Sequence, residues 1–168
     1  SLILDFFSGS ATTAHAVMEL NAEDGGKRKY ICVQLPEETP EGSEARKAGY
    51  DTICEIGKER IRRAGKKIKE ESEATDLDTG FRVLRVDTSN MEEVYFEPAA
   101  LQQDQLFGQV DSVKEDRSDL DLLFGCMVDW GVELSYPLRQ EEVAGKHLYI
   151  VNEGALVACF EEDIDLEV

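Results

Sequence analysis

The sequence lacks several features that would assign it to a common protein class. No apolar run approaches the roughly 18 residues of a membrane span, and no charged-then-apolar leader opens the chain, so a cytoplasmic location is expected. The four cysteines include no Cys-x-x-Cys pair, which argues against a zinc site and fits a reducing compartment. We therefore interpret the cysteines as unpaired core thiols, namely Cys32, Cys54, Cys126 and Cys159.

Positive charge is scarce after residue 69. Residues 1–69 carry 12 basic and 11 acidic side chains, whereas residues 70–168 carry 6 basic and 25 acidic ones, and the net charge of the chain is −18. So acidic a second half should repel a phosphate backbone. If the protein handles DNA, its contact surface is then expected mostly elsewhere. Two interpretations of the acid stay open: a solvated surface, or a docking face for a basic partner.

The length and composition predict a folded protein, of either one domain or two small lobes. With 168 residues, 42% of them hydrophobic, the chain can bury a core and is not of disordered composition. We predict a cofactor-binding part over residues 1–90 and a smaller, acidic α+β region over residues 91–168, incomplete at its end. Because the chain opens on Ser1 inside a strand, we expect a piece of a longer protein.

The segment after the first apolar run is the most informative one. Residues 2–4 are apolar, residues 5–13 read Asp-Phe-Phe-Ser-Gly-Ser-Ala-Thr-Thr, and residues 14–20 are typical of a helix. A strand, a tight turn of small residues and a helix are therefore predicted. In an open α/β sheet this arrangement places a ligand beside the carboxyl end of the strand, with a polar or anionic group facing the helix. Gly9 can adopt dihedral angles that are closed to other residues.

A second buried strand is predicted over residues 30–36, and Gln34 lies where this fold class usually has an acid that binds ribose hydroxyls. The amide of Gln34 can donate and accept hydrogen bonds, although it lacks a carboxylate's charge. Gln34 is alternatively only a polar strand end. Leu35 either lies against an adenine ring or fills the core.

These residues resemble a known family. Residues 5–13 are similar to Asp-x-Phe-x-Gly-Ser-Gly-Thr-Thr, the S-adenosylmethionine motif of amino-methylating DNA methyltransferases, with Ala11 in place of the second glycine. The methyl group of Ala11 is expected to narrow the space in which the backbone of the turn approaches the cofactor. Residues 12–18 and 33–37 resemble the modification subunits of type III restriction-modification systems. The resemblance continues diffusely through residues 87–90, a helix ending in Trp-Gly, and the strand at residues 154–160.

The resemblance implies part of a Rossmann-like methyltransferase sheet and S-adenosylmethionine as cofactor. The parent protein would transfer a methyl group to adenine N6 in DNA after flipping the base out of the stack. Its partners would be DNA, mostly through regions outside this fragment, a restriction subunit, and a second modification subunit in a homodimer. The family's catalytic Asp-Pro-Pro-Tyr tetrapeptide is absent from the chain. No catalytic residue is therefore assigned, and the fragment alone is predicted to be inactive.

The same resemblance assigns roles within the turn. Gly9 permits close approach of the cofactor, the backbone amides of residues 10–12 face its carboxylate, Asp5 holds its amino group and Gln34 its ribose. Thr13 and His15 are expected to pack. The predicted cofactor-binding set is Asp5, Phe6, Phe7, Ser8, Gly9, Ser10, Ala11, Thr12, Gln34 and Leu35.

Two other functions stay open. A nicotinamide-dependent enzyme of this fold would need Gly-x-Gly-x-x-Gly and an acid near Gln34, and the chain has neither. A non-catalytic acidic interaction module would keep the fold without the ligand.

The remaining segments yield coarser predictions. A helix starts near Thr52 with a capping box to Glu55, and we interpret its basic side chains over residues 58–69 as a solvated face, with phosphate or the acidic half as alternative partners. Residues 80–87 alternate like a strand, which would place Asp87 near the adenine amino group. Asp87 is alternatively part of a turn or helix cap. Residues 91–117 predict a helix or a lid-like excursion.

The chain ends in a helix and a hairpin. Residues 118–131 predict a Ser-capped helix with a glycine stop, and Met127 and Trp130 are expected in the core. Residues 146–160 predict a β-hairpin that joins a larger sheet. His147 is interpreted as structural.

Overall fold

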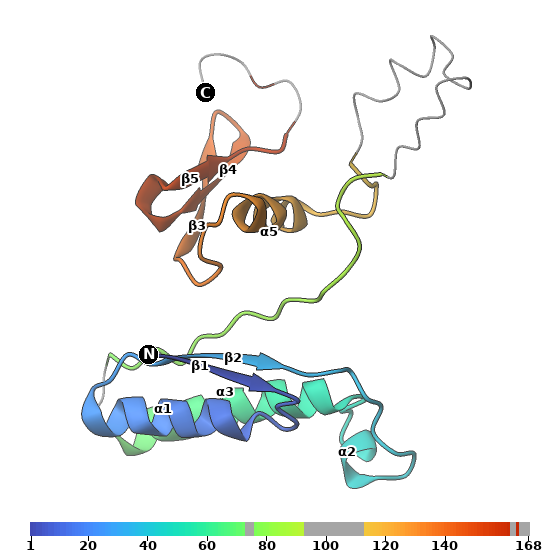
Figure 1. Cartoon of the computed structure of the whole chain (residues 1–168), viewed down its shortest axis with the longest axis vertical. Helices are drawn as coiled ribbons and strands as arrows, with labels where there is room; N and C mark the ends of the chain where they lie inside the picture. The colour runs from blue at the N-terminus through green and yellow to red at the C-terminus, as the bar shows by residue number, and fades with distance from the viewer. Residues whose placement is uncertain (73–75, 93–112, 162–163, 165–168) are drawn as a thin grey trace. The chain divides into compact units, whose positions relative to one another are not determined.

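The computed structural model describes residues 1–72, 76–92, 113–161 and 164, and it divides the chain into two compact units, residues 1–81 and 82–168 (Figure 1). The first unit holds a small parallel sheet and the second an antiparallel one. The molecule is therefore mixed α/β, in the predicted order. The predicted division after residue 90 stays a prediction.

The first unit is built on the predicted strand, turn and helix. Strand β1 (Leu2–Phe6) pairs in parallel with β2 (Lys29–Val33), so that Leu4 lies beside Ile31 and Phe6 beside Val33. Helix α1 (Thr12–Asp24) makes the crossover between the two strands, which parallel pairing requires. Helix α2 (Glu44–Lys47) is a single turn in the following loop, and α3 (Ile53–Glu71) follows it. Figure 1 shows α1 and α3 on the same face of the sheet.

Only that helix-covered face of the sheet is buried. The core of the unit is formed by small and aliphatic side chains of α1 and α3, with Tyr30 and Cys32 of β2 packed against them: Ala11, Ala14, Met18, Ile61, Ala64 and Ile68. Strand residues alternate between faces, so the other face presents large apolar side chains to solvent. These are Leu2, Leu4, Phe6, Ile31 and Val33, with exposed fractions from 42% to 62%. We call them the open sheet face.

Helix α3 begins where the sequence predicts. The hydroxyl of Thr52 accepts a hydrogen bond from the amide of Glu55 at 3.4 Å, which caps the first turn. Most basic side chains of the helix pair with acids one turn away, as Lys58 does with Glu55 at 2.5 Å and Arg63 with Glu59 at 2.6 Å. These i,i+3 and i,i+4 pairs favour the interpretation as a solvated helix face.

In the described part of the second unit, a helix packs on a three-stranded sheet. Helix α5 (Asp119–Asp129) begins with a capping box between Ser118 and Asp121. Strands β3 (Leu138–Val143), β4 (Lys146–Val151) and β5 (Leu156–Ala158) are antiparallel, and the short 3-10 helix η1 (Asn152–Gly154) forms the turn between the last two. The predicted hairpin and the larger sheet are thus confirmed. The core consists of Leu123, Met127, Tyr149, Val151 and Leu156.

Two sequence predictions in this part of the chain are wrong. Met127 is buried as predicted, but Trp130 is 69% exposed. The reason is that α5 ends at Asp129, so Trp130 is the C-cap residue beyond the last helical turn, and the left-handed Gly131 changes the chain direction directly after it. Residues 80–87 form no strand, because no described segment pairs with them, and Val86 is fully exposed. Residues 93–112, most of the predicted excursion, lie outside the described residues.

All four cysteines are free thiols, but they are of intermediate burial and not the core residues expected from the sequence. Cys32 packs against the core of the first unit. Among the described residues, no helix has the length and apolar character needed to cross a membrane. Within the same part of the chain, no three His, Cys, Asp or Glu side chains come together in a way that could hold a metal ion.

Candidate cofactor-binding site

The turn after β1 has a strained backbone. Phe7, Gly9 and Ala11 all adopt left-handed conformations, with φ angles of 61°, 55° and 59°. For residues with a side chain such conformations cost of order 1–3 kcal/mol each, and they persist where the surrounding structure holds them and function uses them. The sequence predicted this freedom only for Gly9, so the conformations of Phe7 and Ala11 were missed.

Hydrogen bonds to residues at the end of β2 hold the turn in place. The amides of Phe7 and Ser8 both donate to the carbonyl of Val33, at 2.8 and 3.2 Å. The amide of Gly9 donates to the side-chain oxygen of Gln34 at 2.7 Å, and the Gln34 side-chain nitrogen donates to the Leu35 carbonyl at 3.2 Å. Gln34 therefore lies at the predicted edge of the sheet, and its amide contacts the glycine of the motif.

Asp5 is held by a partner that the sequence did not reveal. The hydroxyl of Thr13 in α1 donates to one carboxylate oxygen of Asp5 at 2.5 Å. Asp5 lies beside Cys32 of β2, and burial together with this carboxylate raises the pKa of the Cys32 thiol. Thr13 thus orients the Asp5 side chain, which leaves the second carboxylate oxygen as an acceptor.

Helix α1 starts without a side-chain cap, and Ala11 occupies its N-cap position. The first amides of a helix need acceptors, and an uncapped start attracts an anionic group. Ala11 is only 3% exposed, and its methyl group lies 3.5 Å from where a Cβ at Gly57 of α3 would be. The methyl group that replaces the family's glycine hydrogen therefore packs toward α3.

Apolar side chains surround this edge of the sheet. Phe6, Phe7 and Leu35 are 62%, 76% and 58% exposed. The predicted set is thus brought together at one place, where β1 and β2 end: polar groups from Asp5 and Gln34, backbone amides of the turn, and exposed apolar surface. Such a combination suits a ligand with both a charged end and an aromatic ring.

A separate hollow of about 360 Å³ lies between α1 and α3 and shares no lining residue with the predicted set. His15 borders it and contacts Glu19 at 3.1 Å. The expectation that His15 has no ligand role in the turn agrees with this location.

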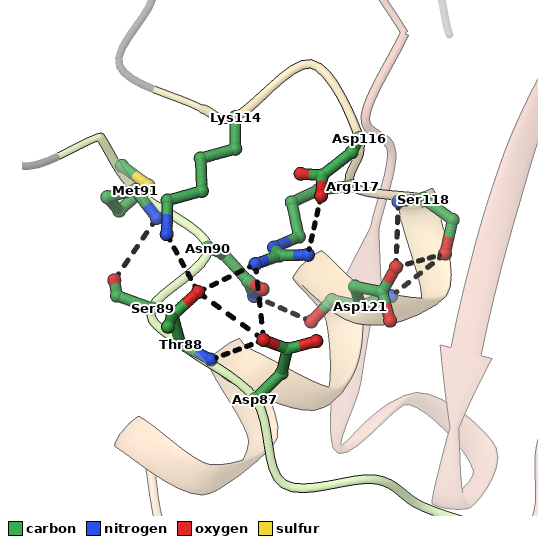
Figure 2. Close-up of polar contacts among 10 residues, drawn as sticks. All are labelled: Asp87, Thr88, Ser89, Asn90, Met91, Lys114, Asp116, Arg117, Ser118 and Asp121. Carbon is green, nitrogen blue, oxygen red and sulfur yellow. Dashed lines mark hydrogen bonds and ion pairs between the residues drawn. The ribbon is translucent and has the colours of Figure 1, made fainter.

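Asp87 takes part in a polar cluster of the second unit, shown in Figure 2. Its carboxylate accepts from the amide of Thr88 at 2.7 Å, and this bond, with Arg117 nearby, lowers the pKa of Asp87. The Thr88 hydroxyl accepts from Lys114 at 2.9 Å and from Arg117 at 3.0 Å, and Asn90 donates to the carbonyl of Asp121 at 2.8 Å. The turn interpretation is therefore correct, and the interpretation of Asp87 as the end of a third strand is wrong.

His147 is a structural residue in the sense predicted. Its ring nitrogen lies 2.7 Å from the carboxylate of Glu161, and its backbone amide donates to the same oxygen at 2.8 Å. These contacts, the amide first, lower the pKa of Glu161. The pair ties the start of β4 to the segment that follows β5.

The first unit is thus a parallel α/β unit with a small-residue turn at the carboxyl edge of its sheet. No family model matches the chain. It is 49% identical over 87 residues to the StyLTI Mod subunit of the type III restriction-modification enzyme from Salmonella typhimurium, and 44% identical over 85 residues to the EcoP15I Mod subunit from Escherichia coli. The type II methyltransferase M.KpnI from Klebsiella pneumoniae is 46% identical over 56 residues.

The matched stretch covers 52% of this chain but only 13% of the StyLTI subunit, and 51% and 12% for EcoP15I. The chain is therefore homologous, over about half of its length, to the modification subunits of type III restriction-modification enzymes. It spans about an eighth of the length of these relatives.

Proposed function

We propose that this chain contains the cofactor-binding part of an S-adenosylmethionine-dependent DNA adenine methyltransferase, within a Rossmann-like sheet. The observation that carries the proposal is the left-handed turn of residues 7–11, which carries the motif and is hydrogen-bonded to the end of β2. The homology to modification subunits supports the same cofactor.

The residues of the turn fit the two ends of this cofactor. The amides of Ser10 and Thr12 at the start of α1 would hold its carboxylate, whereas the Ala11 amide already donates to the Ser8 carbonyl at 2.8 Å. The free oxygen of Asp5 would accept from the amino group of the cofactor. Phe6, Phe7 and Leu35 offer apolar surface for the adenine ring. When bound, S-adenosylmethionine supplies an electrophilic methyl group. The contribution of this chain is to orient that donor.

The open sheet face supports the proposal that a larger domain is needed. Parallel sheets are almost always covered on both faces, whereas β1 and β2 are covered on one. The relatives contain about seven-eighths of their length outside the matched stretch. We therefore propose that residues outside this chain complete the sheet and supply the catalytic tetrapeptide, and that the chain alone transfers no methyl group. DNA, a restriction subunit and a second modification subunit would be partners of the complete, cytoplasmic protein.

Calorimetric titration with S-adenosylhomocysteine tests the proposal. We expect saturable binding by the wild-type chain and none by Gly9→Val, because a β-branched side chain disfavours the left-handed turn. Gly25→Val is the matched control, since Gly25 is also left-handed but lies at the other end of α1. Equal binding by all three proteins, or tighter binding of a nicotinamide dinucleotide, would contradict the proposed function.

A further inference from the structure

Gln34 has two hydrogen bonds within the protein before any ligand arrives. Its side-chain oxygen accepts from Gly9 at 2.7 Å, across 25 residues of sequence, and its nitrogen donates to the Leu35 carbonyl at 3.2 Å. The first bond lies at the short end of the usual range for an N–H to oxygen contact. Through this bond Gln34, the residue that follows β2, holds Gly9 at the centre of the strained turn.

The second bond favours an amide at this position. The Leu35 carbonyl already accepts from the Glu37 amide at 2.8 Å, and the longer bond from the Gln34 nitrogen fixes the side chain with its oxygen toward Gly9. A carboxylate could accept from Gly9 but could not donate to Leu35. The replacement of the usual acid by Gln34 therefore suits a side chain whose partners are two backbone groups of the protein.

The turn depends on such external bonds. Two of its three left-handed residues carry side chains, and each such conformation is unfavourable in isolation. The Val33 carbonyl holds the first half of the turn, at Phe7 and Ser8, and Gln34 holds Gly9. On the side of α3, Gly57 lies next to the turn, since a Cβ there would be in ordinary van der Waals contact with the Gly9 carbonyl at 3.4 Å.

We propose that Gln34 is a positioning residue, which acts on the cofactor through the Gly9 amide instead of gripping the ribose hydroxyls. It keeps the turn in the shape that leaves the amides of Ser10 and Thr12 and the Asp5 carboxylate in place. The inference rests on the proposed function, since positioning has meaning only if the turn binds a ligand.

The experiment compares Gln34→Leu, which removes both bonds, with Gln34→Glu, which keeps the acceptor. Each is titrated with S-adenosylhomocysteine and with its 2′,3′-dideoxy analogue, which lacks the ribose hydroxyls. We expect Gln34→Leu to bind both ligands about tenfold more weakly, the effect of one hydrogen bond. Gln34→Glu should recover most of that loss. Equal losses for the two ligands separate positioning from ribose contact.

Asn21→Leu is the matched control. Asn21 is also an amide side chain that fastens a loop, through the backbone of Arg28 at 2.9 and 3.0 Å, but it lies at the far end of α1. It should lose stability and keep its affinity. If Gln34→Leu weakens only the ligand that carries ribose hydroxyls, or if Asn21→Leu lowers affinity as much, the proposal is overturned.

Hydrogen exchange of the Gly9 amide provides a readout without ligand. In the positioning model this amide exchanges much faster in Gln34→Leu than in the wild type, and Gln34→Glu restores its protection. Unchanged exchange would overturn the proposal. If the wild type binds neither ligand while the Gly9 amide responds as expected, the proposed function fails and the hydrogen-bonded role of Gln34 stands.

Discussion

Individual side chains of the candidate site are defined by partners distant in the sequence. The sequence located Asp5 and Gln34 correctly at strand ends, because strand and turn patterns are local. It could not identify Thr13 as the partner of Asp5 or Gly9 as the partner of Gln34. These contacts depend on how β1 pairs with β2 and on how the start of α1 packs against β1. The Rossmann analogy supplied a ribose role for Gln34 that its hydrogen bonds do not require.

Alanine substitutions at two left-handed glycines should distinguish an effect on stability from an effect on ligand binding. Gly9→Ala and Gly25→Ala each place a Cβ on a residue with positive φ, and neither Cβ would meet an atom within 4 Å. Both should therefore lower the free energy of unfolding by about 1 kcal/mol, from backbone strain alone. Urea denaturation measures this loss. Only Gly9→Ala should also weaken S-adenosylhomocysteine binding, and a similar loss of affinity in Gly25→Ala would argue against a site at the turn.

The thiol of Cys32 should report the Asp5 environment. Burial and the Asp5 carboxylate raise the Cys32 pKa, so at a pH near the ordinary thiol value more of the folded protein remains protonated. We expect iodoacetamide to alkylate Cys32 more slowly in the folded chain than in urea, with a midpoint at higher pH. Peptide mapping by mass spectrometry follows each cysteine. A midpoint equal to that of the unfolded chain would contradict this electrostatic environment.

Helices and strands were predicted with unequal success, for a physical reason. Helix starts at Thr52 and Ser118 follow from local capping chemistry, and both are confirmed. A strand needs a partner, and alternation alone cannot provide one, so the pattern at residues 80–87 did not produce a strand. The length of α5 also explains why Trp130 is exposed, because the helix ends one residue before it.

The open sheet face should tolerate polar substitution in this chain. Ile31 is 46% exposed, whereas Leu123 in the second unit is fully buried. Ile31→Thr keeps a β-branched side chain and should lower the free energy of unfolding by about 1 kcal/mol or less. Leu123→Ala should lower the free energy of unfolding of the second unit by about 2–5 kcal/mol, which is the typical cost of truncating a buried leucine. Urea denaturation followed by circular dichroism compares them, and a comparable loss in Ile31→Thr would mean that the face is covered within this chain.

Charge is a property of the whole molecule here, because the net charge of −18 arises after residue 69. Like-charge repulsion destabilises a compact state, and salt screens it over a Debye length of about 10 Å at 0.1 M. The paired cations of α3 contact acids of their own helix and leave this excess in place.

We therefore expect the melting temperature to rise when NaCl is increased at neutral pH. A Glu115→Gln/Glu142→Gln double variant removes two exposed acids of the second half and should melt higher at low salt, with a smaller response to added salt. Thermal melts followed by circular dichroism test both expectations. A melting temperature that falls with salt, or an unaltered response in the double variant, would contradict the role of repulsion.

The hydrogen bonds that the turn donates to Val33 and Gln34 also set the order in which parts of the first unit can fold. Phe7, Ser8 and Gly9 lie near the start of the chain, yet their external acceptors are synthesised some twenty-five residues later. The turn can reach its strained shape only after α1 has formed and β2 has aligned with β1, a non-local and therefore slow pairing. On the ribosome, the motif then stays without its strained shape until the residues some twenty-five positions after it have emerged.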